Sequence, residues 1–293
     1  MSKSVFAADL GGTKLACAVV GADGKIFRQL TEKLQTGSAT APIEQMVRLA
    51  RELGGPYAAA GVAVPGLARR NGTVWAPNVP GWERMPVARL LEKHLRVPVA
   101  VESDRNAVVM GEAWRGAARG KQDVVVLIVG TGIGAGILSG GKLVRGAHEL
   151  SGCAGWMALG GKETAEFRKR GELETLAAGP AVARAAARMK LKGTTEEIAS
   201  LARSGDARAK KIFDEVGRVL GLSVANLISL FDPEVVVLTG GLTGAVDLFL
   251  EKLEQTARER CQPLVAREVE IRVSRLQAKV NLLGAAKVAW EEQ

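Results

Sequence analysis

Cysteine, histidine and aromatic residues are scarce in this chain of 293 residues. The three cysteines, Cys17, Cys153 and Cys261, have no paired spacing, which argues against a disulfide framework and favours a reducing cytoplasm. A structural zinc ion needs about four closely spaced cysteine or histidine ligands. These cysteines and the two histidines do not supply that spacing, so we expect no structural zinc.

Membrane and targeting segments are also lacking. Residues 124–141 have no charged side chain, but six of them are glycine and the pattern breaks into strand and turn, so we expect no membrane span. Only a few apolar residues precede Asp9, which is too short a stretch for a signal peptide. We therefore expect a cytoplasmic protein without a membrane partner.

The chain has an excess of basic residues, with a net charge of +9 and a pI near 9.7, which nucleic-acid binding could explain. However, the basic residues are spread over predicted helices with acids interleaved, and only one Tyr and six Phe are present. An aromatic-rich basic strip is missing. We favour a solvated basic surface that suits an anionic nucleotide substrate, and we expect no nucleic-acid partner.

The length and the 47% hydrophobic content indicate a globular chain of one large or two medium domains. Hydrophobic periodicity and turn residues indicate where its helices and strands lie. They predict helices at 42–53, 86–95, 105–116, 176–189, 194–203, 206–231, 246–261 and 282–290, and strands at 26–31, 58–64, 97–101, 235–238 and 270–273.

Residues 5–20 have the pattern of a strand, a tight turn and a second strand, and the turn holds the first candidate site. Asp9 ends the buried strand, where a carboxylate is costly unless it meets something such as a hydrated Mg2+. Gly11 and Gly12 have no side chains, so their N–H groups can approach a phosphate closely, and Thr13 adds a hydroxyl donor. An ordinary glycine hairpin with a strand-end Asp is the alternative.

The same arrangement recurs about 120 residues later, with a predicted strand at 123–129, a glycine-rich turn at 130–136 and another strand from Ile137. Two such units suggest two similar half-domains that offer backbone donors to one polyphosphate. The glycines fall at every second position and a strand follows, unlike the dinucleotide-binding and Walker A patterns. A third glycine turn, at 239–242, follows another buried strand.

In these turns the sequence resembles the ROK family of sugar kinases and related repressors, and the resemblance extends over nearly the whole chain. It implies an α/β fold of two domains, the actin-like ATPase (ribonuclease H-like) fold, with a cleft between the domains. The small N-terminal domain would comprise residues 1–117 and 279–293, because the last helix of the family packs back on the first domain. Residues 118–278 would form the large C-terminal domain, and the family suggests a homodimer.

The resemblance also implies that ATP is bound by the three glycine turns, with Mg2+ held near Asp9 through water. In actin-like kinases, a Gly-Gly pair at the third turn lies against the adenosine. The implied nucleotide-binding residues are Asp9, Gly11, Gly12, Thr13, Lys14, Gly130, Thr131, Gly132, Gly134, Gly240 and Gly241.

Asp104 is the candidate catalytic base, at a predicted strand-to-helix junction. A carboxylate there can cap the helix or accept the proton of an attacking sugar hydroxyl. Family kinases place their catalytic Asp at this position, usually after Asn, whereas Ser103 precedes it here. The shorter side chain could lose one sugar hydrogen bond or leave room for a water. We favour the base interpretation.

The sugar side would be formed by Gly66, Asn78, Ser103, Asp104 and Glu174, as the resemblance implies. Asn78 lies in the Pro-rich loop 75–82 and can donate and accept hydrogen bonds at once, as sugar hydroxyls require, or it can cap its own turn. Glu174 stands at a sugar-binding Glu position of the family. Alternatively, it is a Glu at a helix N-terminus, which the helix dipole favours.

The sugar side also departs from the family. Cys153 and Trp156 replace a Glu that grips sugar hydroxyls and a His that touches sugar and binds zinc, and residues 167–174 replace the cysteine-rich zinc loop. His148 and Glu149 could substitute for the lost pair, or Glu149 could be an ordinary loop residue. Trp156 could stack on a sugar, but we favour a role in filling the space left by the zinc loop.

Three functions are compared. The first is an ATP-dependent, glucokinase-like sugar kinase that phosphorylates a hydroxyl of a hexose or hexose-like acceptor, most often the 6-hydroxyl, and the intact Asp9, Asp104 and glycine turns favour it. A transcriptional regulator would need a helix-turn-helix before Asp9, where we expect none. The alternative is a non-catalytic homologue that binds nucleotide or sugar. The acceptor itself is not predicted, because the residues that would identify it are replaced.

Overall fold

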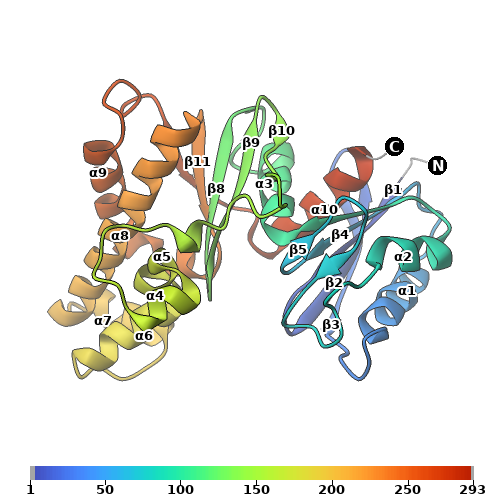
Figure 1. Cartoon of the computed structure of the whole chain (residues 1–293), viewed down its shortest axis with the longest axis horizontal. Coiled ribbons are helices and arrows are strands. Elements are labelled where there is room, and N and C mark those ends of the chain that lie inside the picture. The colour runs from blue at the N-terminus through green and yellow to red at the C-terminus, as the bar shows by residue number, and fades with distance from the viewer. Residues whose placement is uncertain (1–3, 292–293) are drawn as a thin grey trace. The chain divides into compact units, whose positions relative to one another are not determined.

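The computed structural model describes residues 4–291 and divides into two compact units (Figure 1). Unit 1 comprises Met1–Gly120, Arg145–Leu150 and Arg275–Gln293, and unit 2 comprises Lys121–Val144 and Ser151–Ser274. The division expected from the sequence differs from this one by a few residues at two borders. The expected division also placed Arg145–Leu150 in the large C-terminal domain. In the structure these residues belong to unit 1, where Arg145 pairs with Glu102.

Unit 1 is built on a mixed five-stranded sheet in the order β3-β2-β1-β4-β7. The first three strands form an antiparallel meander, and β4 and β7 continue the sheet in parallel. The strands are β1 (Ser4–Leu10), β2 (Lys14–Gly21), β3 (Ile26–Lys33), β4 (Ala60–Val64) and β7 (Val99–Ser103), with a small separate ribbon of β5 (Leu67–Ala68) and β6 (Val74–Trp75). The helices are α1 (Ala41–Leu53), α2 (Val87–Leu95), α3 (Asp104–Arg115) and α10 (Val280–Glu291), and Gln277–Lys279 form a short 3-10 turn, η3.

Helices cover both faces of this sheet (Figure 1). Successive side chains of a strand point to opposite faces, and in β1 apolar side chains on both faces are buried under helices. Phe6 and Ala8 of β1 join the core under α1 and α2. Val5 and Ala7 join the core under α3 and α10. The final helix thus packs on unit 1, as the family resemblance implied, and it fits closely: a Cβ on Gly284 would lie 1.7 Å from the Ala107 carbonyl oxygen.

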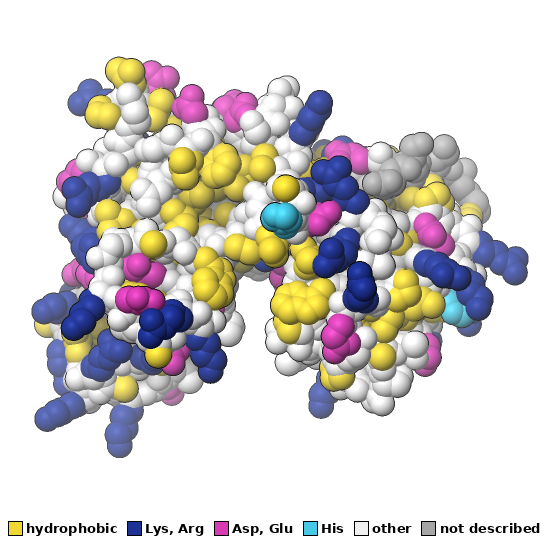
Figure 2. Space-filling model, in the orientation of Figure 1, with side chains coloured by type: hydrophobic (Ala, Val, Ile, Leu, Met, Phe, Trp, Pro, Cys, Tyr) yellow, Lys and Arg dark blue, Asp and Glu magenta, His cyan; other side chains and the backbone are white. Residues whose placement is uncertain are grey.

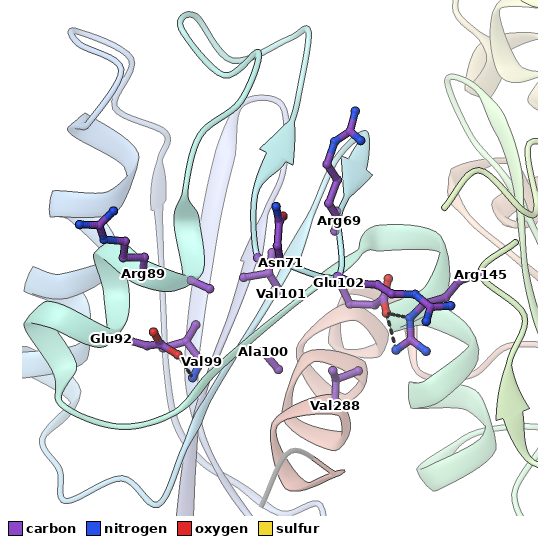
Figure 3. Close-up of a pocket in the computed structure, with 14 residues that line it drawn as sticks. Arg69, Asn71, Arg89, Glu92, Val99, Ala100, Val101, Glu102, Arg145 and Val288 are labelled. Atoms are coloured by element: carbon purple, nitrogen blue, oxygen red, sulfur yellow. Dashed lines mark hydrogen bonds and ion pairs between the residues drawn. The ribbon is translucent and has the colours of Figure 1, made fainter. Parts of the chain in front are cut away.

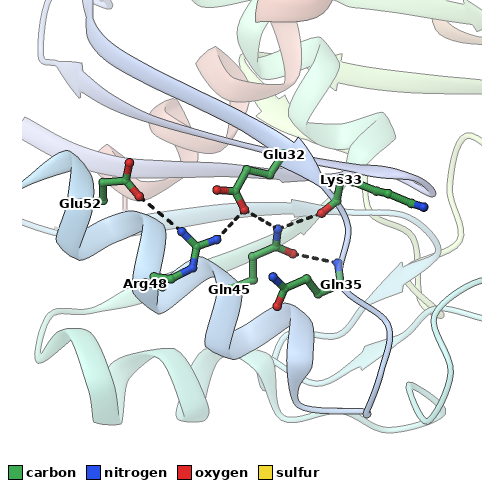
Figure 4. A network of polar contacts seen from close by, with 6 residues as sticks. All are labelled: Glu32, Lys33, Gln35, Gln45, Arg48 and Glu52. Carbon is green, nitrogen blue, oxygen red and sulfur yellow. Dashed lines mark hydrogen bonds and ion pairs between the residues drawn. The ribbon is translucent and has the colours of Figure 1, made fainter.

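A buried amide fixes α1 to the meander (Figure 4). The Nε2 of Gln45 donates to Glu32 and to the carbonyl of Lys33, each at 3.0 Å, and its Oε1 accepts the N–H of Gln35. Arg48, one helical turn later, pairs with Glu32 as well. Because Gln45 is 1% exposed, all three of its bonds replace contacts with water.

Unit 2 repeats the strand plan of unit 1 in the order β10-β9-β8-β11-β12. β8 pairs with β9 antiparallel and with β11 parallel, as β1 does with β2 and β4. The predicted pair of similar half-domains is therefore confirmed. The strands are β8 (Val124–Val129), β9 (Ile133–Ser139), β10 (Lys142–Leu143), β11 (Val235–Thr239) and β12 (Glu270–Val273). The helices are α4 (Ala165–Arg170), α5 (Glu172–Ala177), α6 (Gly179–Arg188), α7 (Thr195–Arg203), α8 (Ala207–Phe231) and α9 (Leu250–Arg260), with 3-10 segments η1 (Ala154–Trp156) and η2 (Gly241–Leu248).

Several predicted boundaries in unit 2 were wrong. The helix predicted at 176–189 is two helices, α5 and α6, because Ala178 between them is extended. The helix predicted at 246–261 starts only at Leu250, after η2. The predicted turn at 130–136 was too long, since β9 already begins at Ile133.

On the face in Figure 2, Lys and Arg side chains occur on many parts of the surface, with acidic side chains among them, and some lie next to one another. The solvated basic surface that the sequence favoured stays a prediction. None of the helices described within residues 4–291 has the length and apolarity that a membrane span needs.

Candidate active site

Two carboxylates of unit 1 form the electrostatic centre of the site. Asp9 stands near the end of β1, where Ala16 and Ala63 are its partners in the ladder. Burial raises the pKa of Asp9 to about 6, a hydrogen bond from Asn281 opposes the rise, and the charge of Asp104 adds to it. Burial likewise raises the pKa of Asp104, with the neighbouring Arg105 guanidinium as an opposing influence. Because the charge of Asp104 acts on Asp9, the structure brings the two predicted aspartates near each other.

Asp104 is not the helix cap. Ser103 occupies the N-cap position of α3, and its Oγ accepts the N–H of Asn106 at 3.4 Å. Asp104 is the first residue of the helix and its Oδ1 accepts the N–H of Arg105 at 2.8 Å. The capping alternative for Asp104 was therefore wrong. Ser103 is 2% exposed, and its predicted contact with sugar stays a prediction.

Glu102 holds the start of this helix through hydrogen bonds, and it was not predicted as a site residue. Its Oε1 accepts the N–H of Ser103 at 2.9 Å and the Nδ2 of Asn106 at 2.8 Å. Its Oε2 is paired with Arg145 at 2.8 Å, and the side chain is buried. A charged residue at the end of an otherwise apolar strand was the available signal, because such a group is costly without partners.

Asn281 is a second residue that the sequence analysis missed. Its Nδ2 donates to Asp9 Oδ1 at 3.1 Å across 272 positions of sequence. Its own Oδ1 is buried and has no hydrogen-bond partner among the described residues. A buried acceptor of this kind beside a carboxylate fits a hydrated cation, whose water ligands donate hydrogen bonds. Nothing in the sequence near Asn281 indicated this contact.

The first glycine turn leaves part of its backbone free. The N–H of Gly11 donates to the Lys14 carbonyl at 2.9 Å and closes the hairpin, so the expectation that Gly11 offers its N–H to a phosphate was wrong. A Cβ on Gly12 would meet nothing within 4 Å, and its φ is not in the left-handed region. Neither packing nor backbone strain therefore requires glycine there, and Gly12, Thr13 and Lys14 are all exposed.

The second glycine turn, in unit 2, is also closed by a backbone hydrogen bond and has an exposed tip. The N–H of Gly130 donates to the Gly132 carbonyl at 2.9 Å, while Thr131 is exposed at the tip of the turn. Gly134 is buried in β9 opposite Ile128, and so lies in the strand and not in the turn.

Gly240 and Gly241 of the third turn differ in what they require. Gly240 has a φ of +99°, and a Cβ there would lie 2.5 Å from the Val129 carbonyl oxygen, so the backbone explains this glycine. A Cβ on Gly241 would meet nothing within 4 Å. Gly241 therefore leaves open space, as Gly12 does.

Two predicted sugar contacts of unit 1 lie on loops. Gly66 has a φ of +95°, and a Cβ would lie 2.3 Å from the Trp75 carbonyl oxygen, so the turn itself requires this glycine. Asn78 is exposed, and no hydrogen bond in the described structure joins its side chain to its own turn. The loop after it is fixed by Trp82, whose Nε1 donates to the Ala39 carbonyl at 2.8 Å.

Glu174 holds the second glycine turn. It lies in the first turn of α5, as the dipole interpretation predicted, and its Oε2 accepts the N–H of Ile133 at 2.9 Å. A Cβ on Gly132 would lie 2.7 Å from the same oxygen. The carboxylate is thus packed under the turn, and its predicted contact with sugar is untested.

The segment that replaces the zinc loop is supported by a buried carboxylate. Glu172 accepts the N–H groups of Leu159 and Gly161, at 3.0 and 2.8 Å. Trp156 is 59% exposed, so the expectation that it fills the space of the zinc loop was wrong. Within residues 4–291, no group of three or more His, Cys, Asp or Glu side chains is placed to hold a metal ion. His148 is exposed.

Comparison with known proteins decides the family. The family model described as ROK family matches residues 5–292. The chain belongs to the ROK family. A ROK relative, the glucokinase of Thermotoga maritima, is 30% identical over 97% of this chain and 96% of its own length.

Two solved ROK structures share the fold. The ROK hexokinase of Thermus thermophilus is 32% identical, with a TM-score of 0.85 over 99% of this chain and 98% of that one. A ROK glucokinase from Streptomyces griseus, solved with glucose and AMPPNP, is 27% identical, with a TM-score of 0.79 over 98% and 99%. The chain thus has the two-domain, actin-like ATPase fold of ROK sugar kinases. Repressors also occur among its relatives, so family membership alone does not establish catalysis.

Proposed function

We propose that this protein is an ATP-dependent sugar kinase, which transfers a phosphoryl group from Mg-ATP to a hydroxyl, the 6-hydroxyl, of a hexose or hexose-like acceptor. The observation that carries the proposal is the pair of half-buried aspartates, Asp9 and Asp104, whose pKa values are raised by partial burial and whose like charges repel each other. A structural protein gains nothing from placing two such groups together, whereas phosphoryl transfer needs both a base and a metal ligand.

Asp104 is the proposed general base. Its Oδ1 accepts the N–H of Arg105 at 2.8 Å, and the carboxylate would accept the proton of an attacking hydroxyl. The raised pKa makes the carboxylate a stronger base at neutral pH. Ser103 and Asn106 fix the start of the helix that presents it, with Glu102 bonded to both.

Asp9 and Asn281 are the proposed residues that hold Mg2+ through water. The ion would supply charge neutralisation for the phosphates of ATP. Asn281 would accept a hydrogen bond at its orphaned Oδ1, and Asp9 would stay ionised above pH 6. Gly12 and Gly241 would give the phosphates and the nucleoside the room that a side chain would fill.

The test is ADP release from Mg-ATP with a panel of hexoses, N-acetylhexosamines, ketoses and polyols. Asp104→Asn should lower turnover by about 10²- to 10⁴-fold, the usual contribution of a general base, and should leave ATP affinity unchanged. Asp214→Asn, an exposed carboxylate on α8, is the matched control and should retain activity. Turnover that survives Asp104→Asn would contradict the assigned base.

ATP binding without turnover of any acceptor would favour the second candidate, a non-catalytic ROK homologue that binds nucleotide or sugar. The replaced residues Cys153 and Trp156 are the observation in its favour, and the exposed Trp156 indole is a surface on which a sugar can stack. We also propose a homodimer in the cytoplasm, and sedimentation equilibrium tests the dimer.

A further inference from the structure

A cavity of about 540 Å³ lies beside the free edge of the unit 1 sheet (Figure 3). β7 is the last strand of that sheet, and its residues 99–102 line the cavity in succession. Helix α2 contributes Arg89 and Glu92, and α10 contributes Val288. None of the residues assigned above to ATP, Mg2+ or sugar lines it. The volume is typical of small-molecule sites.

The rim of the cavity is basic. Four arginines line it, Arg69, Arg70, Arg89 and Arg145, against the two carboxylates of Glu92 and Glu102, which leaves a formal net charge of +2. Arg69, Arg70 and Arg89 are exposed and make no ion pair in the described part of the chain. Guanidinium groups of this kind bind phosphate with two parallel hydrogen bonds.

Apolar side chains and neutral donors also line the cavity. Ala88, Val99 and Val288 are its apolar members from α2, β7 and α10. The N–H of Val99 points outward to Glu92 Oε1 at 3.4 Å, so the alternation of a strand turns the N–H of Val101 to the same free edge. Asn71 accepts hydrogen bonds at Oδ1 from Thr73, which leaves its NH2 group for a ligand. The combination fits a molecule with an apolar or sugar-like body and one phosphate.

One arginine joins this cavity to the helix of Asp104. Figure 3 shows Arg145 and Glu102 on one side of the cavity, opposite Arg89 and Glu92. Arg145 donates to Glu102 through both Nε and Nη2, and the other oxygen of Glu102 holds the N–H of Ser103 and the side chain of Asn106. An anion that attracts Arg145 weakens its hold on Glu102, and Glu102 in turn fixes the first turn of α3.

We propose that this cavity is an effector site for a small phosphate monoester, a sugar phosphate or a nucleoside monophosphate, and that its occupancy is transmitted to the start of α3 through Arg145 and Glu102. The inference goes beyond the proposed kinase function, because ligand binding and its effect on α3 are measurable without turnover.

The experiment is calorimetric titration of the full chain with glucose 6-phosphate and with AMP, each beside its uncharged counterpart, glucose or adenosine. The ester that fits should bind, and Arg69→Ala/Arg70→Ala should weaken it by at least about tenfold, because charge-assisted hydrogen bonds are lost. The control, Arg51→Ala/Arg188→Ala, removes two exposed arginines outside the cavity and should change the affinity less than twofold. The ester whose affinity falls more in Arg69→Ala/Arg70→Ala identifies the ligand class.

Two results overturn the site directly: neither ester binds, or both double variants weaken binding equally. Binding that Arg69→Ala/Arg70→Ala leaves unchanged also overturns it, because the ester would then be held by the nucleotide or sugar residues. Hydrogen exchange tests the transmission. A saturating ester should alter exchange of the amides at 103–107 in the wild type and not in Arg69→Ala/Arg70→Ala. Binding without any change at 103–107 refutes the transmission and leaves the site.

Discussion

Asp9 should destabilise the folded chain at neutral pH, and Asp9→Asn should therefore stabilise it. The pKa of Asp9 is about 6 in the folded chain and near 3.8 when unfolded. Between these values the folded state binds more protons, so the free energy of unfolding falls as pH rises. Each pH unit corresponds to about 1.4 kcal/mol, which makes the cost of the ionised carboxylate about 3 kcal/mol above pH 7 and about half of that at pH 5.

The assay is urea unfolding at pH 8 and pH 5, followed by tryptophan fluorescence. Trp75, Trp82, Trp114 and Trp290 lie in unit 1, so the signal reports mainly on the unit that holds Asp9. Asp9→Asn should gain about 3 kcal/mol at pH 8 and clearly less at pH 5. The exposed Asp214→Asn control should change stability little at either pH. A variant that is no more stable than the wild type at pH 8, or equally stabilised at both values, would refute the reasoning.

Three further changes separate binding from packing. Asn281→Leu removes a donor that stabilises ionised Asp9. The acid limb of the kcat/KM profile, which we expect near pH 6 in the wild type, should therefore move to higher pH. A limb that does not move would belong to another group. Gly12→Ala should leave the free energy of unfolding within about 1 kcal/mol and weaken ATP binding at least tenfold, measured by calorimetry. Gly284→Ala should destabilise the chain by about 3 kcal/mol or more, since the new Cβ would lie 1.7 Å from the Ala107 carbonyl oxygen.

Gly37→Ala is the control for both glycine variants, because a Cβ at Gly37 would meet nothing within 4 Å and its φ is not left-handed. It should unfold as the wild type does and bind ATP normally. Equal loss of ATP affinity in Gly12→Ala and Gly37→Ala would argue against a phosphate at the first turn. A fully stable Gly284→Ala would show that α3 and α10 can move apart at little cost.

The sequence predicted the two hairpins because strand–turn–strand patterns are local. Short apolar runs between glycine turns predict both hairpins and the buried strands that follow them. β1 and β8 were found on that basis. The errors occur where the conformation of a single residue determines the end of a helix. Ala178 is extended, and it divides a continuous helical pattern into α5 and α6. Nothing in the hydrophobic periodicity marks such a break.

The candidate site was predictable only in part, for the same reason. Asp9 and Asp104 stand at element junctions that a sequence shows directly. Asn281 contacts Asp9 only because α10 returns to unit 1, and a contact made across the fold leaves no local signal. Glu102 left one signal, a charged residue at the end of an apolar strand, but its partner Arg145 lies 43 positions away.

The segment in place of the zinc loop shows how the chain keeps its shape there. Two N–H groups, of Leu159 and Gly161, end on the two oxygens of Glu172, which is 8% exposed. One carboxylate thus ties the loop after η1 to α5 with two charge-assisted hydrogen bonds, by local chemistry that needs no metal. These two hydrogen bonds do not involve Trp156, and its indole faces solvent. The substitutions at Cys153, Trp156 and residues 167–174 are therefore compatible with an ordered fold.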